Sequence, residues 1–173
     1  MNDNYKIVSL YCFSPIEEKK LFNLRDEFEK FEEKGLTGLI ILAQEGLNGT
    51  ICGRETIVNI FHREIKNFFE DLDLNEKFSF SENKIFKKLK IKIKAEIVTM
   101  GINEISPEIK SGIYVDSEQW NNLLIDEKTI VIDTRNHYEV SLGSFENAIN
   151  PNLKNFREFP DWINKNPKKN YQR

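Results

Sequence analysis

The chain has 173 residues, of which 39% are hydrophobic and 31% charged, and its net charge is -3. This length allows two small domains of ordinary size. No segment approaches the roughly 18 consecutive apolar residues of a membrane span. The N-terminal sequence has no basic leader and no cleavage site of small residues. These features argue against a membrane protein and predict a cytoplasmic one.

The two cysteines, Cys12 and Cys52, are not arranged as a CxxC pair. Both lie in apolar, strand-like sequence, where a cysteine most often behaves as a small buried hydrophobic residue. A disulfide is not expected in a reducing compartment. We therefore predict two buried free thiols.

The first part of the chain alternates between strand and helix patterns. The first helix is predicted to end at Gly35, and residues 44–48 have hairpin-like turn chemistry. A second helix follows the third strand. The order is βαββαβ, which is that of a ferredoxin-like unit. The predicted strands are residues 6–13, 38–43, 49–52 and 86–94; the first helix is 17–34, with Leu21, Leu24, Phe28 and Phe31 inward, and the second carries Ile57, Phe61, Ile65, Phe68 and Leu72 inward.

The last predicted strand carries a stripe of lysines. Residues 84–94 contain six lysines and no acidic residue. Period two places alternate residues of a strand on one face. Two interpretations are equally favoured: the stripe contacts RNA phosphates, or it is a solvated outer face that protects an edge strand from unwanted pairing. The lysines on that face are Lys88, Lys90, Lys92 and Lys94.

The second part begins after residues 99–112, where Gly, Pro and Ser without periodicity predict a linker. Asp116 or Ser117 is expected to cap a helix that carries Trp120, Leu123 and Leu124. Another amphipathic helix is predicted around Phe156, Phe159, Trp162 and Ile163, with Pro160 in its early part.

Between these helices, the apolar run from Ile130 to Ile132 predicts a strand buried on both faces. Asp133 and Arg135 follow at its carboxyl end, where open parallel sheets form ligand crevices. The alternative is structural: Asp133 accepts backbone hydrogen bonds in the turn, and Arg135 pairs with a neighbouring carboxylate.

Several motifs in this second part resemble the opening of a rhodanese domain. They are Asp133-Thr134-Arg135, Tyr138-Glu139, Gly143-Ser144-Phe145 and Ala148-Ile149-Asn150-Pro151. Arg135-Asn136 and the later Phe156-Arg157-Glu158-Phe159-Pro160 narrow the resemblance to the bacterial rhodanese-type, oxygen-dependent tRNA uridine hydroxylases, the TrhO/YceA family. A general sulfurtransferase more often has Gly-His where this chain has Gly143-Ser144.

The first part also resembles this family. The matching segments are AQEGLNGT at residues 43–50, Phe86-x-x-Leu89-Lys90, and Glu96-Ile97-Val98-Thr99. Together the motifs predict an α+β protein with a ferredoxin-like (acylphosphatase-like) domain at residues 1–98, a linker at 99–112, and an incomplete rhodanese-like domain at 113–173.

The resemblance implies tRNA modification in the bacterial cytoplasm: hydroxylation of the wobble uridine to 5-hydroxyuridine, with molecular oxygen as co-substrate. tRNA would be the partner, and neither DNA nor a membrane is expected. The family depends on a cysteine in a rhodanese loop, which is expected beyond Arg173, so no residue here is assigned a catalytic role and the chain alone is expected to be inactive. Asp133, Arg135 and Asn136 would be active-site scaffold. Glu45, Asn48, Lys88, Lys90, Lys92 and Lys94 are candidate RNA-binding residues.

Two alternatives remain open. One is a rhodanese-type sulfurtransferase, which shares the cysteine chemistry. The other is a non-catalytic RNA-binding module. The sequence contains no motif for an organic cofactor and no Cys/His cluster with metal spacing.

Overall fold

The structure is a computed structural model, and it describes residues 4–69, 74–98 and 112–166. The chain divides into two compact units, Met1–Val98 and Thr99–Arg173. Nearly all of the predicted linker lies outside the described residues. Within the described ranges, no helix has the length and apolar character needed to cross a membrane.

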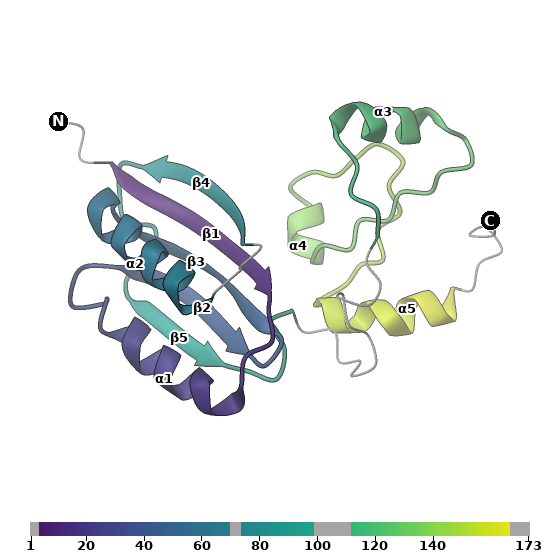
Figure 1. The fold of residues 1–173 in the computed structure, drawn as a ribbon. Coiled ribbons are helices and arrows are strands. Elements are labelled where there is room, and N and C mark those ends of the chain that lie inside the picture. Colours follow the sequence, from purple (N-terminus) through teal and green to yellow (C-terminus); the bar gives the residue numbers. More distant parts are fainter. Residues whose placement is uncertain (1–3, 70–73, 99–111, 167–173) are drawn as a thin grey trace. The chain divides into compact units, whose positions relative to one another are not determined.

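The first unit is a five-stranded sheet with strand order β4-β1-β3-β2-β5. β1 pairs antiparallel with β3 and β4, and β2 pairs antiparallel with β3 and parallel with β5. Helices α1 and α2 lie against the same face of this sheet (Figure 1). The elements are β1 Tyr5–Phe13, α1 Glu18–Glu29, β2 Thr37–Ala43, β3 Gly46–Arg54, α2 Glu55–Phe68, β4 Asn75–Ser81 and β5 Leu89–Ile93.

This arrangement confirms the ferredoxin-like α+β prediction but corrects the identity of one strand. The fourth strand of the βαββαβ unit is β4, which was not predicted from the sequence. The segment predicted as the fourth strand, residues 86–94, forms the shorter β5, an additional strand at the opposite edge of the sheet. β4 was missed because it is a mostly exposed edge strand in which the hydrophobic pattern is weak.

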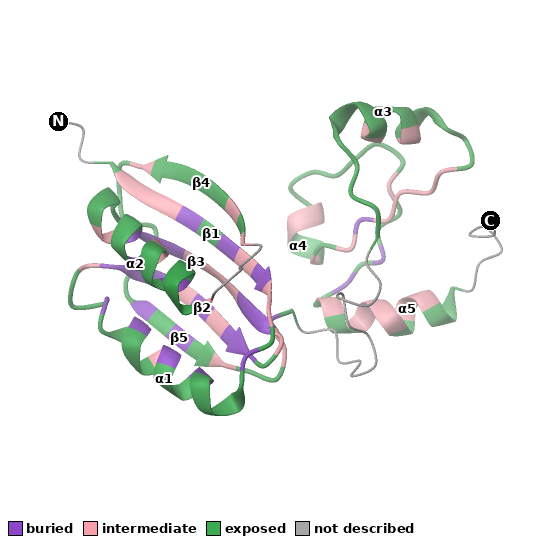
Figure 2. Cartoon of the chain, in the orientation of Figure 1, coloured by how far each residue is buried: buried purple, intermediate pink, exposed green. Residues whose placement is uncertain are grey.

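The core lies between the two helices and the sheet. The predicted stripe of α1 is buried as expected, and the buried residues at the centre of the sheet are visible in Figure 2. The ring of Phe61 on α2 contacts the rings of Phe28 and Phe31, with centroids 4.9 Å apart in both pairs. α1 ends at Glu29, earlier than predicted, and turns then lead to Gly35. Phe68 was predicted to point inward but is exposed, and Leu72 lies outside the described residues.

The hairpin between β2 and β3 depends on two glycines of the AQEGLNGT segment. The connection is only two residues long, because β2 ends at Ala43 and β3 begins at Gly46. Gly46 has a φ of +146°, and a Cβ there would lie 2.0 Å from the carbonyl oxygen of Cys12. A Cβ at Gly49 would lie 2.5 Å from the carbonyl oxygen of Leu39. These two glycines therefore allow β3 to lie close to both of its neighbours.

The second unit consists of short helices joined by extended chain. Asp116 caps the first helix, as predicted, by accepting a hydrogen bond from the backbone N–H of Gln119 (2.8 Å). The predicted strand over residues 130–132 is wrong: Ile132 forms only an isolated parallel bridge with Ile149, and the run is half-buried. The helices are α3 Ser117–Ile125, α4 His137–Val140, the 3-10 helix η1 Phe156–Glu158 and α5 Phe159–Lys165.

Both cysteines are buried and free, which confirms the prediction. Pro160 lies in the first turn of α5, also as predicted. A proline is tolerated there because the first N–H groups of a helix have no partner within it.

Candidate functional site

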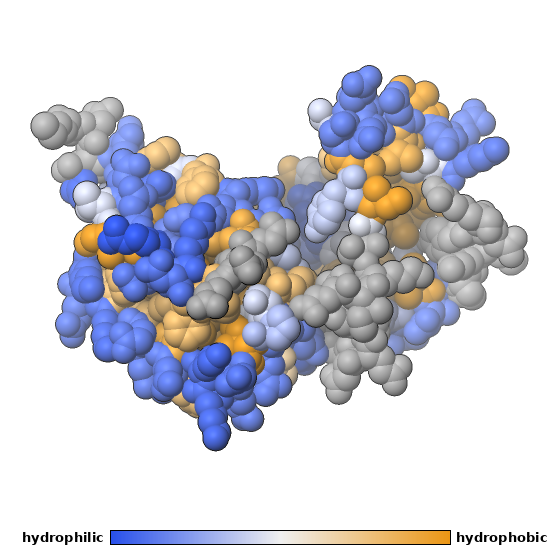
Figure 3. Space-filling view, viewed as in Figure 1, coloured by the Kyte–Doolittle hydropathy of each residue, from blue (hydrophilic) through white to orange (hydrophobic). Residues whose placement is uncertain are grey.

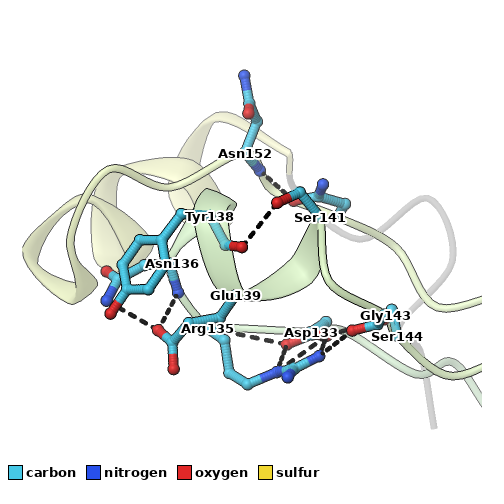
Figure 4. A network of polar contacts seen from close by, with 10 residues as sticks. Asp133, Arg135, Asn136, Tyr138, Glu139, Ser141, Gly143, Ser144 and Asn152 are labelled. Atoms are coloured by element: carbon cyan, nitrogen blue, oxygen red, sulfur yellow. Dashed lines mark hydrogen bonds and ion pairs between the residues drawn. The ribbon is translucent and has the colours of Figure 1, made fainter.

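A polar network surrounds Asp133 in the second unit (Figure 4). The backbone holds this residue beside the extended chain near Ile149, because the N–H of Asp133 donates to the carbonyl of Ile149 (2.9 Å). Asp133 is buried, and its carboxylate accepts hydrogen bonds from Nε and Nη2 of Arg135 (2.9 and 2.6 Å). The hydroxyl of Ser144 donates to the same carboxylate (2.8 Å).

These contacts decide the charge state of the network. The hydrogen bonds from Arg135 hold the pKa of the Asp133 carboxyl well below its usual range, although burial acts in the opposite direction. Ser144 adds to the downward shift, and Asp133 in turn raises the pKa of Arg135. Asp133 is therefore an ionised partner of Arg135 and is unsuited to act as a general base near neutral pH.

Arg135 also ties the network to a loop. Its Nη2 donates to the carbonyl oxygen of Gly143 (2.7 Å), next to the Ser144 that contacts Asp133. The side chain thus joins the end of the 131–133 segment to the loop at residues 143–144. Arg135 pairs with a neighbouring carboxylate, as the structural alternative expected, and that carboxylate is Asp133.

Asn136, the third proposed scaffold residue, belongs to the start of α4. Its backbone N–H and its side-chain Nδ2 both donate to Oε2 of Glu139 (3.1 and 2.9 Å). Asn136 is thus adjacent in sequence to the Asp133–Arg135 pair but bonds to a different carboxylate. The partner roles of Ser144 and Gly143 were not predicted, because hydrogen bonds across eight or more residues have no periodic pattern in sequence.

The lysine stripe has the predicted geometry. Lys90 and Lys92 are exposed on β5, whereas the intervening Ile91 and the preceding Leu89 are buried. Lys88 and Lys94 flank the strand and are also exposed. β5 is an edge strand, so its position agrees with both interpretations of the stripe.

Glu45 and Asn48 make contacts that were not predicted. Oε1 of Glu45 accepts the backbone N–H of Ile97 (2.6 Å), and Nδ2 of Asn48 donates to the carbonyl of Ile97 (3.1 Å). Ile97 is buried. Both the N–H and the carbonyl of Ile97 are therefore bonded to side chains of the β2–β3 hairpin. These bonds couple the hairpin to the path of the chain after β5.

This coupling predicts a stability effect for Glu45. Replacing Glu45 by alanine removes the acceptor for the N–H of the buried Ile97, and an unsatisfied buried donor costs about 1–3 kcal/mol. We expect urea unfolding, followed by far-UV circular dichroism, to show a loss of this size. Gln44→Ala is the matched control, because Gln44 is exposed in the same turn. Equal losses in both variants would contradict the assignment.

Within the described ranges, no group of three or more His, Cys, Asp or Glu side chains could hold a metal ion. Two polar clusters contain residues that the sequence singled out, one cluster in each unit. The first couples the hairpin to Ile97, and the second joins Asp133, Arg135 and Ser144.

The first unit defines the class of the protein, which is an α+β protein with an acylphosphatase-like domain. Residues 5–97 match the UPF0176 acylphosphatase-like domain. The chain belongs to the UPF0176 family.

Curated relatives match both units. A tRNA uridine(34) hydroxylase of Prochlorococcus marinus subsp. pastoris is 54% identical over 166 residues, covering 95% of this chain and 54% of the relative. One from P. marinus strain MIT 9215 is 52% identical over 160 residues, covering 92% and 52%. One from Bartonella quintana is 41% identical over 169 residues, covering 95% and 54%. The chain thus spans about half the length of the curated relatives it matches.

Proposed function

We propose that this chain is part of a protein that hydroxylates uridine 34, the wobble uridine, of tRNA to 5-hydroxyuridine with molecular oxygen as co-substrate. The observation that carries the proposal is the similarity to curated tRNA uridine(34) hydroxylases, at 52–54% identity over 92–95% of the chain. A general sulfurtransferase would need only the second unit. The similarity to the tRNA uridine(34) hydroxylases extends through both units.

The two units are proposed to have different roles. Lys88, Lys90, Lys92 and Lys94 of the first unit are exposed and suited to contact RNA phosphates. Glu45 and Asn48 are proposed to support this surface through Ile97, because their side chains already bond to its backbone.

In the second unit, Asp133, Arg135 and Asn136 are proposed as scaffold beside a reactive cysteine. Ion-paired residues with well-defined hydrogen bonds are suited to hold a neighbouring loop in place. Cys12 and Cys52 are both buried. They are therefore unsuited as exposed nucleophiles, and the proposed cysteine is not among the residues of this chain.

We further propose that residues 113–173 are only part of a rhodanese-like domain, joined to residues 1–98 by a linker at 99–112. None of the helices α3, α4 and α5 has a buried residue. Hydrophobic residues reach the surface of this unit next to α3 (Figure 3). The large exposed hydrophobic side chains include Ile113, Tyr114, Ile125, Tyr138 and Leu142. Their exposure supports an unfilled packing surface.

A cytoplasmic location agrees with tRNA as the substrate.

The test is a gene deletion with analysis of tRNA nucleosides by mass spectrometry. Deleting the gene that encodes this chain is expected to remove 5-hydroxyuridine from position 34 and to leave thiolated nucleosides unchanged. Restoring the gene should restore the modification. Loss of thiolated nucleosides instead would favour the sulfurtransferase. If neither 5-hydroxyuridine nor the thiolated nucleosides change, the result would favour the non-catalytic RNA-binding module.

A further inference from the structure

The sheet of the first unit has one face that neither α1 nor α2 covers. The core residues of β1 on the helix side are Val8, Leu10 and Cys12, so the alternate residues of this strand point to the opposite face. We call this opposite face of the sheet the open face. Its residues are half-buried or exposed across most of its width, and Ser9 at its centre is exposed.

Strand register places a row of residues across the middle of the open face. Ser9 pairs with Lys77 of β4 on one side and with Thr50 of β3 on the other. Thr50 pairs with Leu39 of β2, which pairs with Lys90 of β5. The row therefore has an exposed lysine at each end and a small polar centre, where the hydroxyls of Ser9 and Thr50 are 3.2 Å apart.

Aromatic side chains lie along β1 on the same face. Tyr11 and Phe13 are both half-buried, and their rings meet edge to face with centroids 5.2 Å apart. Tyr5 is at the other end of the strand, where Arg54 lies 4.8 Å and Lys84 lies 5.9 Å from its ring centroid. β4 and β5 are the two edge strands of the sheet, and Lys84 belongs to the connection between them. This connection therefore brings further positive charge to the open face, beside Tyr5.

The charge of the open face is opposite to that of the whole chain. The net charge of the chain is -3, but no strand residue on this face is Asp or Glu. The only acidic residue in the five strands is Glu76 of β4, and its register with Leu10 places it on the helix side. There Glu76 contacts His62 of α2. The open face thus combines exposed cations, aromatic rings and no strand carboxylate.

We propose that the open face binds single-stranded RNA, with bases stacked on the aromatic residues of β1 and phosphates bound by the lysines at the sheet edges. Four-stranded sheets with exposed aromatic residues bind splayed bases in this way. Paired bases in a duplex are stacked on one another and do not present their faces to such a surface. The inference rests on the proposed function, because uridine 34 lies in the single-stranded anticodon loop.

The first test measures binding of the whole chain to an RNA hairpin that contains the anticodon loop, by fluorescence anisotropy at several salt concentrations. Replacing Lys90 and Lys92 together by alanine removes two phosphate contacts. We expect affinity to fall by about 25-fold at about 0.1 M salt, and the slope of log K against log salt to decrease by about 1.4. The matched control is Lys19→Ala with Lys20→Ala, which removes the same charge from exposed positions on α1. The control should bind like the unaltered chain.

The second test separates stacking from charge. Tyr11→Leu keeps an apolar side chain but removes the ring, and is expected to weaken binding by about 5- to 150-fold. Its salt slope should not change. Tyr11→Phe keeps the ring and should bind within about twofold of the unaltered chain. Circular dichroism of each variant shows whether the fold is retained, so that lost binding is not mistaken for unfolding.

Four results would overturn the inference. They are equal binding by the lysine pair and its α1 control, equal binding of the hairpin and a fully paired duplex, no loss with Tyr11→Leu, and no measurable binding of the hairpin. These results are distinct from failure of the proposed function, which the nucleoside analysis tests separately. Loss of 5-hydroxyuridine after gene deletion together with any of the four would retain the function and reject the open face as the RNA site.

Discussion

Replacing Phe61 by alanine is expected to lower the free energy of unfolding of the first unit by about 3–5 kcal/mol, the usual cost of deleting a buried aromatic side chain. Phe61 is 0% exposed and lies at the centre of the core. Its ring contacts those of Phe28 and Phe31, so the substitution removes the contact that joins α2 to the α1 region. The loss is large relative to the 5–15 kcal/mol stability typical of a domain.

The measurement is urea unfolding followed by a probe specific to the first unit. Both tryptophans, Trp120 and Trp162, belong to the second unit, so their fluorescence follows that unit alone. Hydrogen exchange of the strand amides follows the first. Phe22→Ala is the matched control, because Phe22 is on α1 but 48% exposed. It should cost less than about 1 kcal/mol. Similar losses for the two variants would contradict the described core.

Replacing Asp133 by asparagine is expected to destabilise the second unit at neutral pH and to remove part of its sensitivity to acid. The folded pKa of Asp133 lies below its usual range, mainly because of the hydrogen bonds from Arg135. An unfolded Asp has a pKa of about 3.9. The carboxylate therefore contributes stability that is fully present above about pH 4–5 and is lost progressively as pH falls through the folded pKa.

Tryptophan fluorescence during urea unfolding at pH 7, 5, 4 and 3 measures this effect in the second unit. The unaltered chain should lose stability below about pH 4. Asp133→Asn should start from a lower stability at pH 7 and change less over the acid range. Asp161→Asn is the control, because Asp161 is exposed on α5, and its pH profile should follow that of the unaltered chain. Parallel profiles for all three proteins would show that Asp133 does not carry the acid dependence.

The Asp133–Arg135 pair and the lysine stripe have different consequences for the proposed hydroxylase. The charged groups of Asp133 and Arg135 bond to each other, and they also bond to the loop at residues 143–144. It is therefore suited to position a neighbouring segment and not to bind an anionic substrate directly. The lysines of β5 have exposed side chains, and they are the better candidates for contact with RNA.

Local pattern in the sequence was sufficient for several features. The apolar stripe of α1, the cap of α3 and the alternation of lysines on β5 were all predicted. Each depends on residues no more than a few positions apart, whose spacing matches the period of a helix or a strand. Burial of the two cysteines followed in the same way from their apolar surroundings.

Where local pattern was weak or misleading, the sequence-based predictions were wrong. β4 is a mostly exposed edge strand, so its residues lack the apolar alternation that marks a half-buried strand. The apolar run at residues 130–132 predicted a buried strand, but only one bridge forms there. An apolar run shows that a segment favours burial, whereas a strand also requires a neighbouring strand with which to pair.

The sequence by itself determined the first strands and both helices of the first unit, the buried stripe of α1 and the lysine stripe, because these depend on local periodicity. Only the tertiary structure decided that β5 pairs with β2 at the sheet edge, that Glu45 and Asn48 hold Ile97, and that Arg135 and Ser144 share Asp133. These contacts join residues between 2 and 52 positions apart. Which partner each polar group finds depends on how the whole chain packs, and no repeating pattern in the sequence records it.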